Sequence, residues 1–500
     1  MLKKLLFLSL FLLQIIISFS QTKSKLNIEI EKLKTEEPLK HAVWGICIMP
    51  VEKDTILTEY NSNISLIPAS TLKIVTTGAA LSLLGNDFKF ETKLQYDGTF
   101  DSLTGIIKGN LYIIGGGDPT LESEYFKDEK DSLSITDKWA ELLKKKGIKK
   151  ITGAVIGDAS VFDNNTIPPQ WIWADIGNYF GAGACGLTYH DNKYTLYFNS
   201  GTTGSKTTIT KTKPVIDNLQ LVNNVISGGS DDYAFIYGAP YSYYRKVEGT
   251  IPANKTNYEV DGSIPDPALF CAQSLDRSLK NSGIAVEGKA TTMRLLNESL
   301  EFPATNQHLL HTHYSPTLDQ IVYWTNFKSI NLYAEHLLKI LAYKKDLTQE
   351  GATTLRAGMG KEKEGTEIIT DFWKNKGIDM GGFFMNDGCG LSRSNVITAK
   401  TEVQILRMMA KNKTFKPFYN SFPVAGKAGS LENMCEGSFA SNNLCAKSGY
   451  ITRARGYAGY VKNKKGEMLC FSMLANNYEC TPGEMKRYFE KLLVAIADLE

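Results

Sequence analysis

The pattern of hydrophobic and polar positions changes twice along the chain. Its first part predicts a mixture of helices and strands. Apolar residues recur at helical spacing over residues 27–34. Two short alternating segments, 42–49 and 55–60, predict the strands of a β-hairpin. An apolar helix is then predicted from residue 68 to about 84, and Gly85 ends it.

The middle of the chain, from about residue 91 to 303, is rich in Gly, Thr, Asn and Tyr. Short alternating runs such as 89–96 and 105–114 predict β-rich modules here. Because helical and mixed patterns resume after this region, we interpret the β-rich middle as an insertion into a domain that flanks it on both sides.

The last part of the chain returns to long helical patterns, at 318–343 and 366–376. Two strand-like segments follow, at 455–462 and 467–475, and the chain ends in a predicted helix over 484–499. The pattern as a whole therefore predicts a mixed α/β fold.

Length and composition limit the class of protein. Five hundred residues exceed what one hydrophobic core usually organises, so at least two domains are expected. With 43% hydrophobic and 22% charged residues, the chain is not disordered, collagen-like or a coiled coil. A formal net charge of +3 is too small for an electrostatic nucleic-acid interface, so we expect no nucleic-acid partner.

Residues 1–20 predict a secretory signal peptide. Lys3 and Lys4 precede an apolar run over 5–17, and a small-x-small cleavage site follows at 18–20. The run is shorter than the roughly 20 residues that a spanning helix needs, which argues against a retained membrane anchor. Since later segments also lack a long apolar run, we expect an exported chain without a transmembrane segment after cleavage.

The cysteines leave two alternatives open. The late cysteines form two pairs, each ten residues apart, which are Cys435 with Cys445 and Cys470 with Cys480. In an oxidising compartment these pairs can close disulfides, whereas buried free thiols are the alternative. The spacings match no zinc signature, and we expect no metal site.

Candidate chemistry begins with Ser70 and Lys73, at the start of the first apolar helix. A Ser and a Lys three residues apart share a helix face, with Cβ atoms about 5–6 Å apart. Burial and the positive end of the helix dipole both disfavour an ammonium group, so Lys73 is able to act as a neutral base for the Ser70 hydroxyl. A capping Ser with a surface Lys is the alternative.

Two later motifs can complete such a site. Ser329 and Asn331 lie at the head of a predicted helix, where a hydroxyl and an amide can relay a proton and orient a carbonyl. Lys447, Ser448 and Gly449 precede a predicted strand, where a cation and a hydroxyl can bind a carboxylate while the glycine lets a ligand approach closely. A capping Ser beside an Asn is the simpler interpretation of the first motif alone.

Together, in this order and on these elements, the three motifs resemble penicillin-recognising serine DD-peptidases and β-lactamases. The gap of 259 residues between Ser70 and Ser329 requires an insertion. Further segments make the chain similar to low-molecular-mass class C penicillin-binding proteins, the serine-type D-alanyl-D-alanine carboxypeptidases/endopeptidases. The matching segments are 68–73, 109–121, 173–182, 329–335, 387–393, 446–449 and 456–461.

The resemblance implies a role for each motif residue. Ser70 is implied as the acylated nucleophile and Lys73 as its base. Ser329 and Asn331 correspond to the proton relay and the contact with the substrate amide. The resemblance also implies that Lys447 and Ser448 bind a carboxylate, beside Gly449, and that the backbone N–H groups of Ser70 and Tyr450 form the oxyanion hole.

The same resemblance implies the substrate and the compartment. The expected substrates are peptidoglycan stem peptides in the periplasm, with β-lactams as inhibitors that acylate Ser70 and with neither a metal nor an organic cofactor. We expect a transpeptidase-like core with an antiparallel sheet and helices over 21–92 and 304–500. Residues 93–303 are expected to form the inserted β-rich region, as two nested domains. The oligomeric state stays open.

The chain departs from the family pattern in its third motif. Lys-Ser-Gly-Tyr replaces the usual Lys-Thr-Gly-Thr, and Arg453 stands where a small residue is common. The departure leaves substrate preference open. A β-lactamase-like hydrolase and a catalytically silent peptidoglycan-binding protein are the two alternative functions.

Three other patterns were considered and set aside. Residues 181–186 spell a dinucleotide-binding fingerprint but follow no predicted strand. His308, His311 and His313 lie in a segment that we interpret as an exposed linker without a carboxylate partner. The segment 427–429 imitates the third motif without its hydroxyl.

Overall fold

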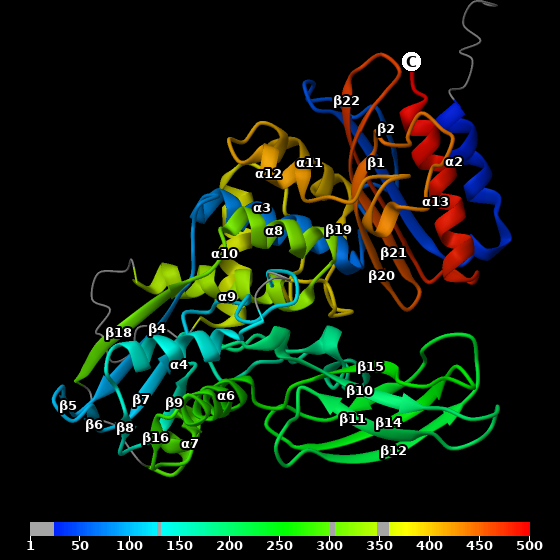
Figure 1. Cartoon of the computed structure of the whole chain (residues 1–500). Helices are drawn as coiled ribbons and strands as arrows, with labels where there is room; N and C mark the ends of the chain where they lie inside the picture. The colour runs from blue at the N-terminus through cyan, green and yellow to red at the C-terminus, as the bar shows by residue number, and fades with distance from the viewer. Residues whose placement is uncertain (1–24, 128–131, 301–305, 348–359) are drawn as a thin grey trace, which may run out of the picture.

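The structure, a computed structural model, describes residues 25–127, 132–300, 306–347 and 360–500. Figure 1 shows two lobes, of which one holds both ends of the described chain and the other holds its middle. The predicted signal peptide, residues 1–20, lies outside the described residues. Within the described ranges, no helix combines the length and apolar character needed to cross a bilayer.

The first lobe is built on a five-stranded antiparallel sheet in the order β2-β1-β22-β21-β20. Its strands are β1 (Val43–Pro50), β2 (Thr58–Tyr60), β20 (Cys445–Ile451), β21 (Ala454–Lys462) and β22 (Met468–Asn476). The predicted hairpin is confirmed, since β1 and β2 pair with Cys47 opposite Glu59. The sheet joins the two ends of the chain, because β1 also pairs with β22 along its whole length.

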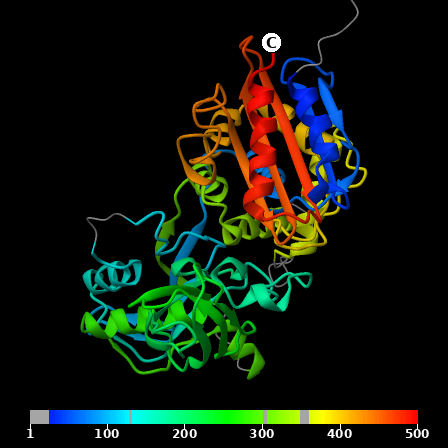
Figure 2. The ribbon, with the colours of Figure 1, turned by 90° about the vertical axis from the view of Figure 1, so that its right-hand side faces the viewer.

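Helices cover both faces of this sheet. On one face, α2 (Lys25–Thr35) and α13 (Pro482–Ala497) lie side by side, as Figure 2 shows. A capping box between Thr481 and Glu484 begins α13 at the predicted place. The other face packs against a helical cluster consisting of α3 (Lys73–Leu84), α8 (Leu318–Phe327), α9 (Asn331–Leu347), α10 (Glu362–Asn375), α11 (Ala399–Ala410) and α12 (Phe415–Asn420).

Helix α3 runs through the centre of that cluster. Every residue from Lys73 to Leu81 is buried, as expected for a helix that is surrounded by others. It follows directly on a 3-10 turn, η2 (Ala69–Leu72), and ends at Gly85, where φ is 85°. The predicted helix over 68–84 is therefore confirmed, with a tighter first turn.

The helical pattern over 318–343 is present but is not one continuous helix, and the predicted head of a helix at Ser329 and Asn331 is confirmed. The structure has two helices there, α8 and α9, separated by a break at Lys328, Ser329 and Ile330. Ser329 adopts the left-handed conformation, with φ of 60°, which a continuing α-helix does not allow. The apolar periodicity runs through the break because both helices pack on the same core.

The second lobe has a layered α/β part. A five-stranded sheet in the order β17-β9-β7-β4-β18 and a four-stranded sheet in the order β16-β8-β6-β5 pack with helices against one core. The strands are β4 (Glu91–Asp97), β5 (Thr99–Asp101), β6 (Ile106–Lys108), β7 (Leu111–Ile114), β8 (Lys150–Ile151), β9 (Val155–Asp158), β16 (Ala285–Val286), β17 (Thr291–Thr292) and β18 (Gln307–Tyr314).

A β-sandwich-like part is nested within this lobe, between β9 and α6. Its two three-stranded sheets have the orders β11-β10-β15 and β12-β14-β13. Their strands are β10 (Lys193–Asn199), β11 (Thr208–Lys213), β12 (Gln220–Ser227), β13 (Phe235–Tyr237), β14 (Tyr244–Ile251) and β15 (Tyr258–Ser263). The β-rich character that the sequence predicts for the middle of the chain is thus present.

The hydrophobic pattern of the sequence did not predict the helices of the second lobe. They are α4 (Ile135–Lys145), α5 (Trp173–Ile176), α6 (Pro267–Asn281) and α7 (Met293–Glu298). The start of α6 carries a clear signal, because the Asp266 side chain caps the helix and Pro267 stands at its first position. The remaining elements of the described residues are two short strands and four 3-10 helices: β3 (Ser65–Leu66), β19 (Ile397–Thr398), η1 (Glu37–Leu39), η3 (Tyr179–Gly181), η4 (His190–Asn192) and η5 (Gly429–Leu431).

The three histidines expected in an exposed linker lie instead in β18, an edge strand. His308, His311 and His313 pair there with residues of β4 in the second lobe. Since β18 follows residue 303, we propose that the predicted division, with 21–92 and 304–500 as one domain and 93–303 as the insertion, has its return boundary closer to Tyr314.

All eight cysteines are free thiols, and seven of them are buried. The disulfide alternative for the pairs Cys435–Cys445 and Cys470–Cys480 is therefore not realised in the structure. Burial raises the pKa of the Cys445 thiol to about 12, which keeps the thiol protonated and unreactive.

Candidate active site

Ser70 lies in the 3-10 turn that leads into α3, and it is half-buried. The preceding Ala69 has a positive φ of 48°, a conformation that a side chain tolerates only under constraint. Its carbonyl is packed against Gly390, where an added Cβ would come within 1.8 Å of the Ala69 oxygen. This packing fixes the backbone that carries Ser70.

The amine of Lys73 reaches Ser70 from within the protein interior. The Lys73 side chain is fully buried, with a relative exposure of 0%. Its Nζ donates to Ser70 Oγ at 3.0 Å, to Asn331 Oδ1 at 2.7 Å and to the Cys389 carbonyl at 2.8 Å. Burial lowers the pKa of the Lys73 amine below its usual value of 10.5.

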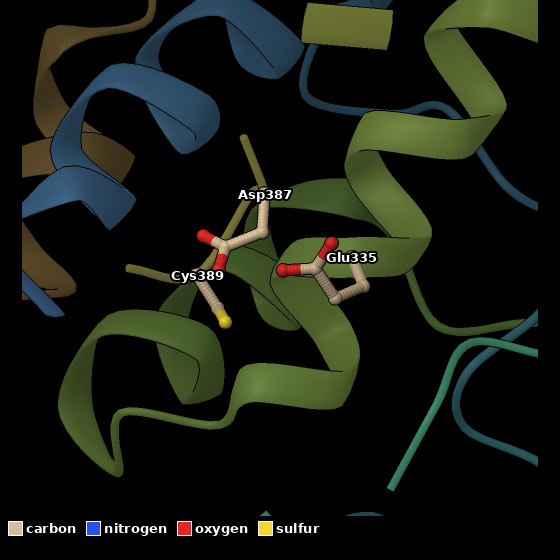
Figure 3. A group of neighbouring side chains, drawn as sticks. All are labelled: Glu335, Asp387 and Cys389. Carbon is tan, nitrogen blue, oxygen red and sulfur yellow. The ribbon is translucent and has the colours of Figure 1, made fainter. Parts of the chain in front are cut away.

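A buried acidic group lies behind Lys73. It consists of Glu335 on α9 with Asp387 and Cys389 from one loop, and Figure 3 shows the three side chains pointing toward one another. The charges of these groups act against burial and raise the pKa of Lys73. Burial and the charge of Asp387 in turn raise the pKa of Glu335 from 4.5 to about 8.

The donor set of this acidic group does not suit a metal ion, although its ligand atoms lie within 4.8 Å of one another. Each Asp387 oxygen already accepts two hydrogen bonds from N–H groups. The donors are the Gly390 and Ser392 backbone amides, Asn395 Nδ2 and Trp171 Nε1, at 2.6–2.8 Å. Because these donors occupy its lone pairs, Asp387 acts as a buried anion that organises its own loop.

Ser329 and Asn331 come from the break between α8 and α9. The left-handed backbone at Ser329 turns its hydroxyl toward β20, where it accepts a hydrogen bond from Lys447 Nζ at 2.9 Å. Asn331 begins α9, and its Nδ2 donates to the Phe180 carbonyl at 2.8 Å. Phe180 belongs to η3, so the second lobe contributes directly to the site.

Lys447 lies in the middle of β20 with an exposure of 1%. Its Nζ also donates to the Ser448 carbonyl at 2.7 Å. Burial lowers the pKa of Lys447 well below its usual value, and the charge of Lys73 lowers it further. The Ser448 hydroxyl donates to Ser430 Oγ at 2.7 Å.

Gly449 lets β20 approach the Ser70 turn. A Cβ at this position would lie 2.5 Å from the Pro68 carbonyl oxygen and 2.9 Å from the Ser70 nitrogen. Tyr450, the next residue, is 49% exposed, and the guanidinium of Arg455 lies 4.9 Å from its ring centroid.

Replacing Gly449 by Ala should therefore displace β20 from Ser70. We expect a decrease of about tenfold or more in the rate of acylation by penicillin, because a displacement of about 1 Å in a reacting geometry costs up to 10²-fold. The rate is measured by mass spectrometry of the intact chain. Gly483→Ala is the control, because a Cβ there meets only the end of Arg487 at 3.9 Å. A Gly449→Ala chain that acylates at the wild-type rate would contradict this packing.

The structure thus brings together all eight residues that the motifs single out: Ser70, Lys73, Ser329, Asn331, Lys447, Ser448, Gly449 and Tyr450. Several groups around them were not predicted from the sequence, namely the carbonyls of Cys389 and Phe180, the acidic pair Glu335 and Asp387, and Ser430. Backbone carbonyls carry no sequence signal. Ser430 directly follows the segment 427–429, which was set aside because it lacks the hydroxyl of the third motif.

Comparison with known proteins identifies the family. The profile of the D-Ala-D-Ala carboxypeptidase 3 (S13) family matches residues 26–498. The chain belongs to this family. The predicted family, the mixed fold class and the predicted class of enzyme, a serine-type D-Ala-D-Ala carboxypeptidase, are confirmed.

Relatives of this S13 peptidase cover almost its whole length. The D-alanyl-D-alanine carboxypeptidase DacB of Haemophilus influenzae is 27% identical over 471 residues, which are 92% of this chain and 90% of the relative. A D-alanyl-D-alanine carboxypeptidase of Actinomadura sp. is 26% identical over 472 residues, 91% of this chain and 81% of that one.

A solved structure shows the same fold. The crystal structure of penicillin-binding protein 4 (dacB) from H. influenzae superposes with a TM-score of 0.76 at 24% identity, covering 94% of this chain and 98% of that chain. The S13 peptidase therefore shares its two-lobed architecture with a known penicillin-binding protein.

Proposed function

We propose that this S13 peptidase cleaves the bond between the last two D-alanines of a peptidoglycan stem peptide, or a D-amino-acid cross-link, through an acyl-enzyme on Ser70. The observation that carries the proposal is the fully buried Lys73 amine, 3.0 Å from Ser70 Oγ. A hydroxyl becomes an effective nucleophile only when a base accepts its proton, and this amine is the titratable group within hydrogen-bonding distance.

The hydrogen bonds around Lys73 suit a neutral amine as well as an ammonium. A neutral amine has two N–H groups and one lone pair. The two N–H groups can donate to Asn331 Oδ1 and the Cys389 carbonyl, at 2.7 and 2.8 Å. The lone pair then faces Ser70 Oγ and accepts the hydroxyl proton as the oxygen attacks the substrate carbonyl.

Ser329 and Lys447 are proposed to complete the proton path. When the peptide bond breaks, the leaving D-alanine needs a proton on its amine. The hydrogen bond of 2.9 Å between Lys447 Nζ and Ser329 Oγ provides a donor chain for this proton. Asn331 is proposed to hold the substrate amide through its side chain.

The substrate carboxylate is proposed to bind at Lys447 and Ser448. A carboxylate placed beside Lys447 favours the ammonium form, which burial disfavours in the free site. Substrate binding then coincides with proton uptake by Lys447. The backbone N–H groups of Ser70 and Tyr450 are proposed as the oxyanion hole, and the close approach of Gly449 to the Ser70 nitrogen supports this placement.

Export to the periplasm and inhibition by β-lactams are part of the same proposal. A β-lactam complex of the H. influenzae penicillin-binding protein 4 has been solved. In this chain a β-lactam would acylate Ser70 in place of the stem peptide. An adduct that persists for hours would argue against the alternative of a β-lactamase-like hydrolase, which needs rapid deacylation.

The test is mass spectrometry after incubation with penicillin and, separately, with a peptide ending in D-Ala-D-Ala. The wild type should gain one penicilloyl adduct and should release D-alanine from the peptide. Ser70→Ala should do neither, whereas Ser160→Ala, at an exposed serine outside the site, should behave like the wild type. An adduct on the Ser70→Ala chain would refute the proposed nucleophile, and a wild type without either reaction would favour a catalytically silent peptidoglycan-binding protein.

A further inference from the structure

A hollow of the molecule outside the proposed active site takes no part in the mechanism above. It is an open groove of about 620 Å³ between three segments that are far apart in the sequence. We refer to it as the aromatic groove. Six of its lining residues carry the argument: Tyr125, Gln320, Tyr323, Trp324, Lys416 and Asn420.

Aromatic rings form one side of the groove. Helix α8 supplies Tyr323 and Trp324, whose ring centroids lie 5.1 Å apart, and the loop after β7 supplies Tyr125, 5.2 Å from Trp324. All three side chains are partly exposed. A run of half-exposed aromatic rings is a surface on which a flat, partly apolar ligand can pack.

Polar groups form the rest of the lining. Gln320 lies one helical turn before Trp324 on α8, and Lys416 and Asn420 lie on α12, which packs beside α8. All three are exposed. Specific ligand sites combine a largely apolar surface with a few such polar groups that fix the orientation of the ligand.

This combination fits an N-acetylated sugar chain. The C–H groups of a pyranose ring give it an apolar face that can pack on an aromatic ring, while its hydroxyl and acetamido groups form hydrogen bonds around the edge. The amide of Asn420 can donate to and accept from an acetamido group. Gln320 can donate through Nε2, while its Oε1 accepts from Thr317 in the capping box of α8. Lys416 can bind a carboxylate that branches from the sugar chain.

A short chain of packed residues links the groove to the proposed active site. Tyr323 stacks on Phe327 with centroids 5.2 Å apart, and a Cβ on Gly429 would lie 3.3 Å from the Phe327 ring. Ser430, the next residue, accepts the hydrogen bond of Ser448. Phe327, Gly429 and Ser430 therefore separate the aromatic groove from the carboxylate-binding end of the site.

The length of the groove can be compared with the length of a stem peptide. Along α8, Gln320 to Phe327 spans about 10 Å at the rise of an α-helix. Five extended residues span about 17 Å, so an extended stem peptide is longer than this stretch of the helix.

We propose that the aromatic groove binds the glycan strand of peptidoglycan, a β-1,4-linked chain of N-acetylated amino sugars, while the stem peptide of the same strand lies at Ser70. This inference rests on the proposed function, and it adds that the enzyme acts on peptides that are still attached to glycan. The groove would give such substrates affinity that a free peptide lacks.

The first test measures saccharide binding directly, without catalysis. Isothermal titration calorimetry with the tetramer of β-1,4-linked N-acetylglucosamine is performed on the full-length Ser70→Ala chain, and on that chain with Trp324→Ala or with Lys416→Ala and Asn420→Ala together. We expect the tetramer to bind, and each set of changes to weaken binding about tenfold. The double change touches only exposed side chains, so it stays informative if Trp324→Ala impairs folding.

The second test uses the active chain and a ratio of two activities. We expect kcat/KM for a glycan-linked pentapeptide, divided by kcat/KM for the free pentapeptide, to fall about tenfold in the groove variants. Tyr244→Ala, at a tyrosine that is 50% exposed on β14 and outside the groove, should leave the ratio unchanged.

Absence of tetramer binding, or binding that the groove variants do not weaken, would overturn the proposal. Binding of an apolar peptide instead of the saccharide would also overturn it, and would indicate a protein partner. Failure of the proposed function is distinguishable, because calorimetry on the Ser70→Ala chain detects saccharide binding whether or not Ser70 is acylated in the wild type.

Discussion

Lys73→Met is expected to lower the rate of acylation by penicillin by about 10³-fold or more, while the chain stays folded. General-base catalysis typically contributes 10²–10⁴-fold, and groups that act as a unit with the nucleophile often contribute more. Met has a similar length and tolerates burial, whereas the buried amine it replaces costs free energy of desolvation. Loss of activity would therefore not reflect unfolding.

The measurement is the time course of the penicilloyl adduct in the intact chain by mass spectrometry. Lys73→Arg should be as slow as Lys73→Met, because a guanidinium stays charged and cannot accept the proton of Ser70. Lys53→Met, at an exposed lysine paired with Glu467, is the control and should acylate normally. If Lys73→Met acylates within threefold of the wild type, Lys73 is not the base.

Asp387→Ala is expected to give the largest loss of stability among single changes at the site. The buried carboxylate accepts four hydrogen bonds from buried N–H groups, and its removal leaves those donors unpaired. An unpaired buried donor costs about 1–3 kcal/mol. With partial relaxation of the loop, we expect a total of about 3–5 kcal/mol.

The stability change is measured as the shift of the urea midpoint for unfolding of the lobe that contains α3. The loss of penicillin acylation serves as the signal for this unfolding. Asp379→Ala is the matched control. Asp379 is exposed and accepts one hydrogen bond, from the Gly381 amide at 2.9 Å, so its replacement should have a small effect. Equal midpoints for the Asp387→Ala and wild-type chains would mean that the loop does not depend on this anion.

Much of the fold was predictable because its signals are local. The apolar pattern after Pro68, the glycine that ends α3 and the alternating C-terminal strands each depend on a few neighbouring residues. A helix that begins near Ser329 was predicted, but the left-handed backbone of Ser329 was not. The contact of Ser329 with Lys447 on β20 favours this conformation, and β20 lies more than a hundred residues later.

The motif residues of the site were also predictable, since Ser70, Lys73 and Lys447 keep a recognisable spacing to their neighbours. Their surroundings were not. The carbonyls of Cys389 and Phe180 approach Lys73 and Asn331 through loop conformations, and any residue type offers the same carbonyl. Tertiary structure alone supplies these contacts.

The burial of Lys73 likewise became visible only in three dimensions. From sequence, an apolar neighbourhood indicated a dry setting, but helices α8, α9 and α10 from a distant part of the chain complete it. The same tertiary packing brings Glu335 and Asp387 close to the amine, and their charges partly oppose the effect of burial on its pKa.

The central claim, a Lys73 amine beside the Ser70 hydroxyl whose pKa burial lowers, is tested most directly by titrating Lys73 itself. The protein is labelled with ¹³C at the lysine Cε, and the Lys73 signal is assigned by its absence in the Lys73→Met spectrum. Its pH titration is then followed by NMR. We predict a midpoint below that of the exposed lysines in the same spectrum, because burial disfavours the ammonium form. A midpoint equal to or above theirs would contradict the account.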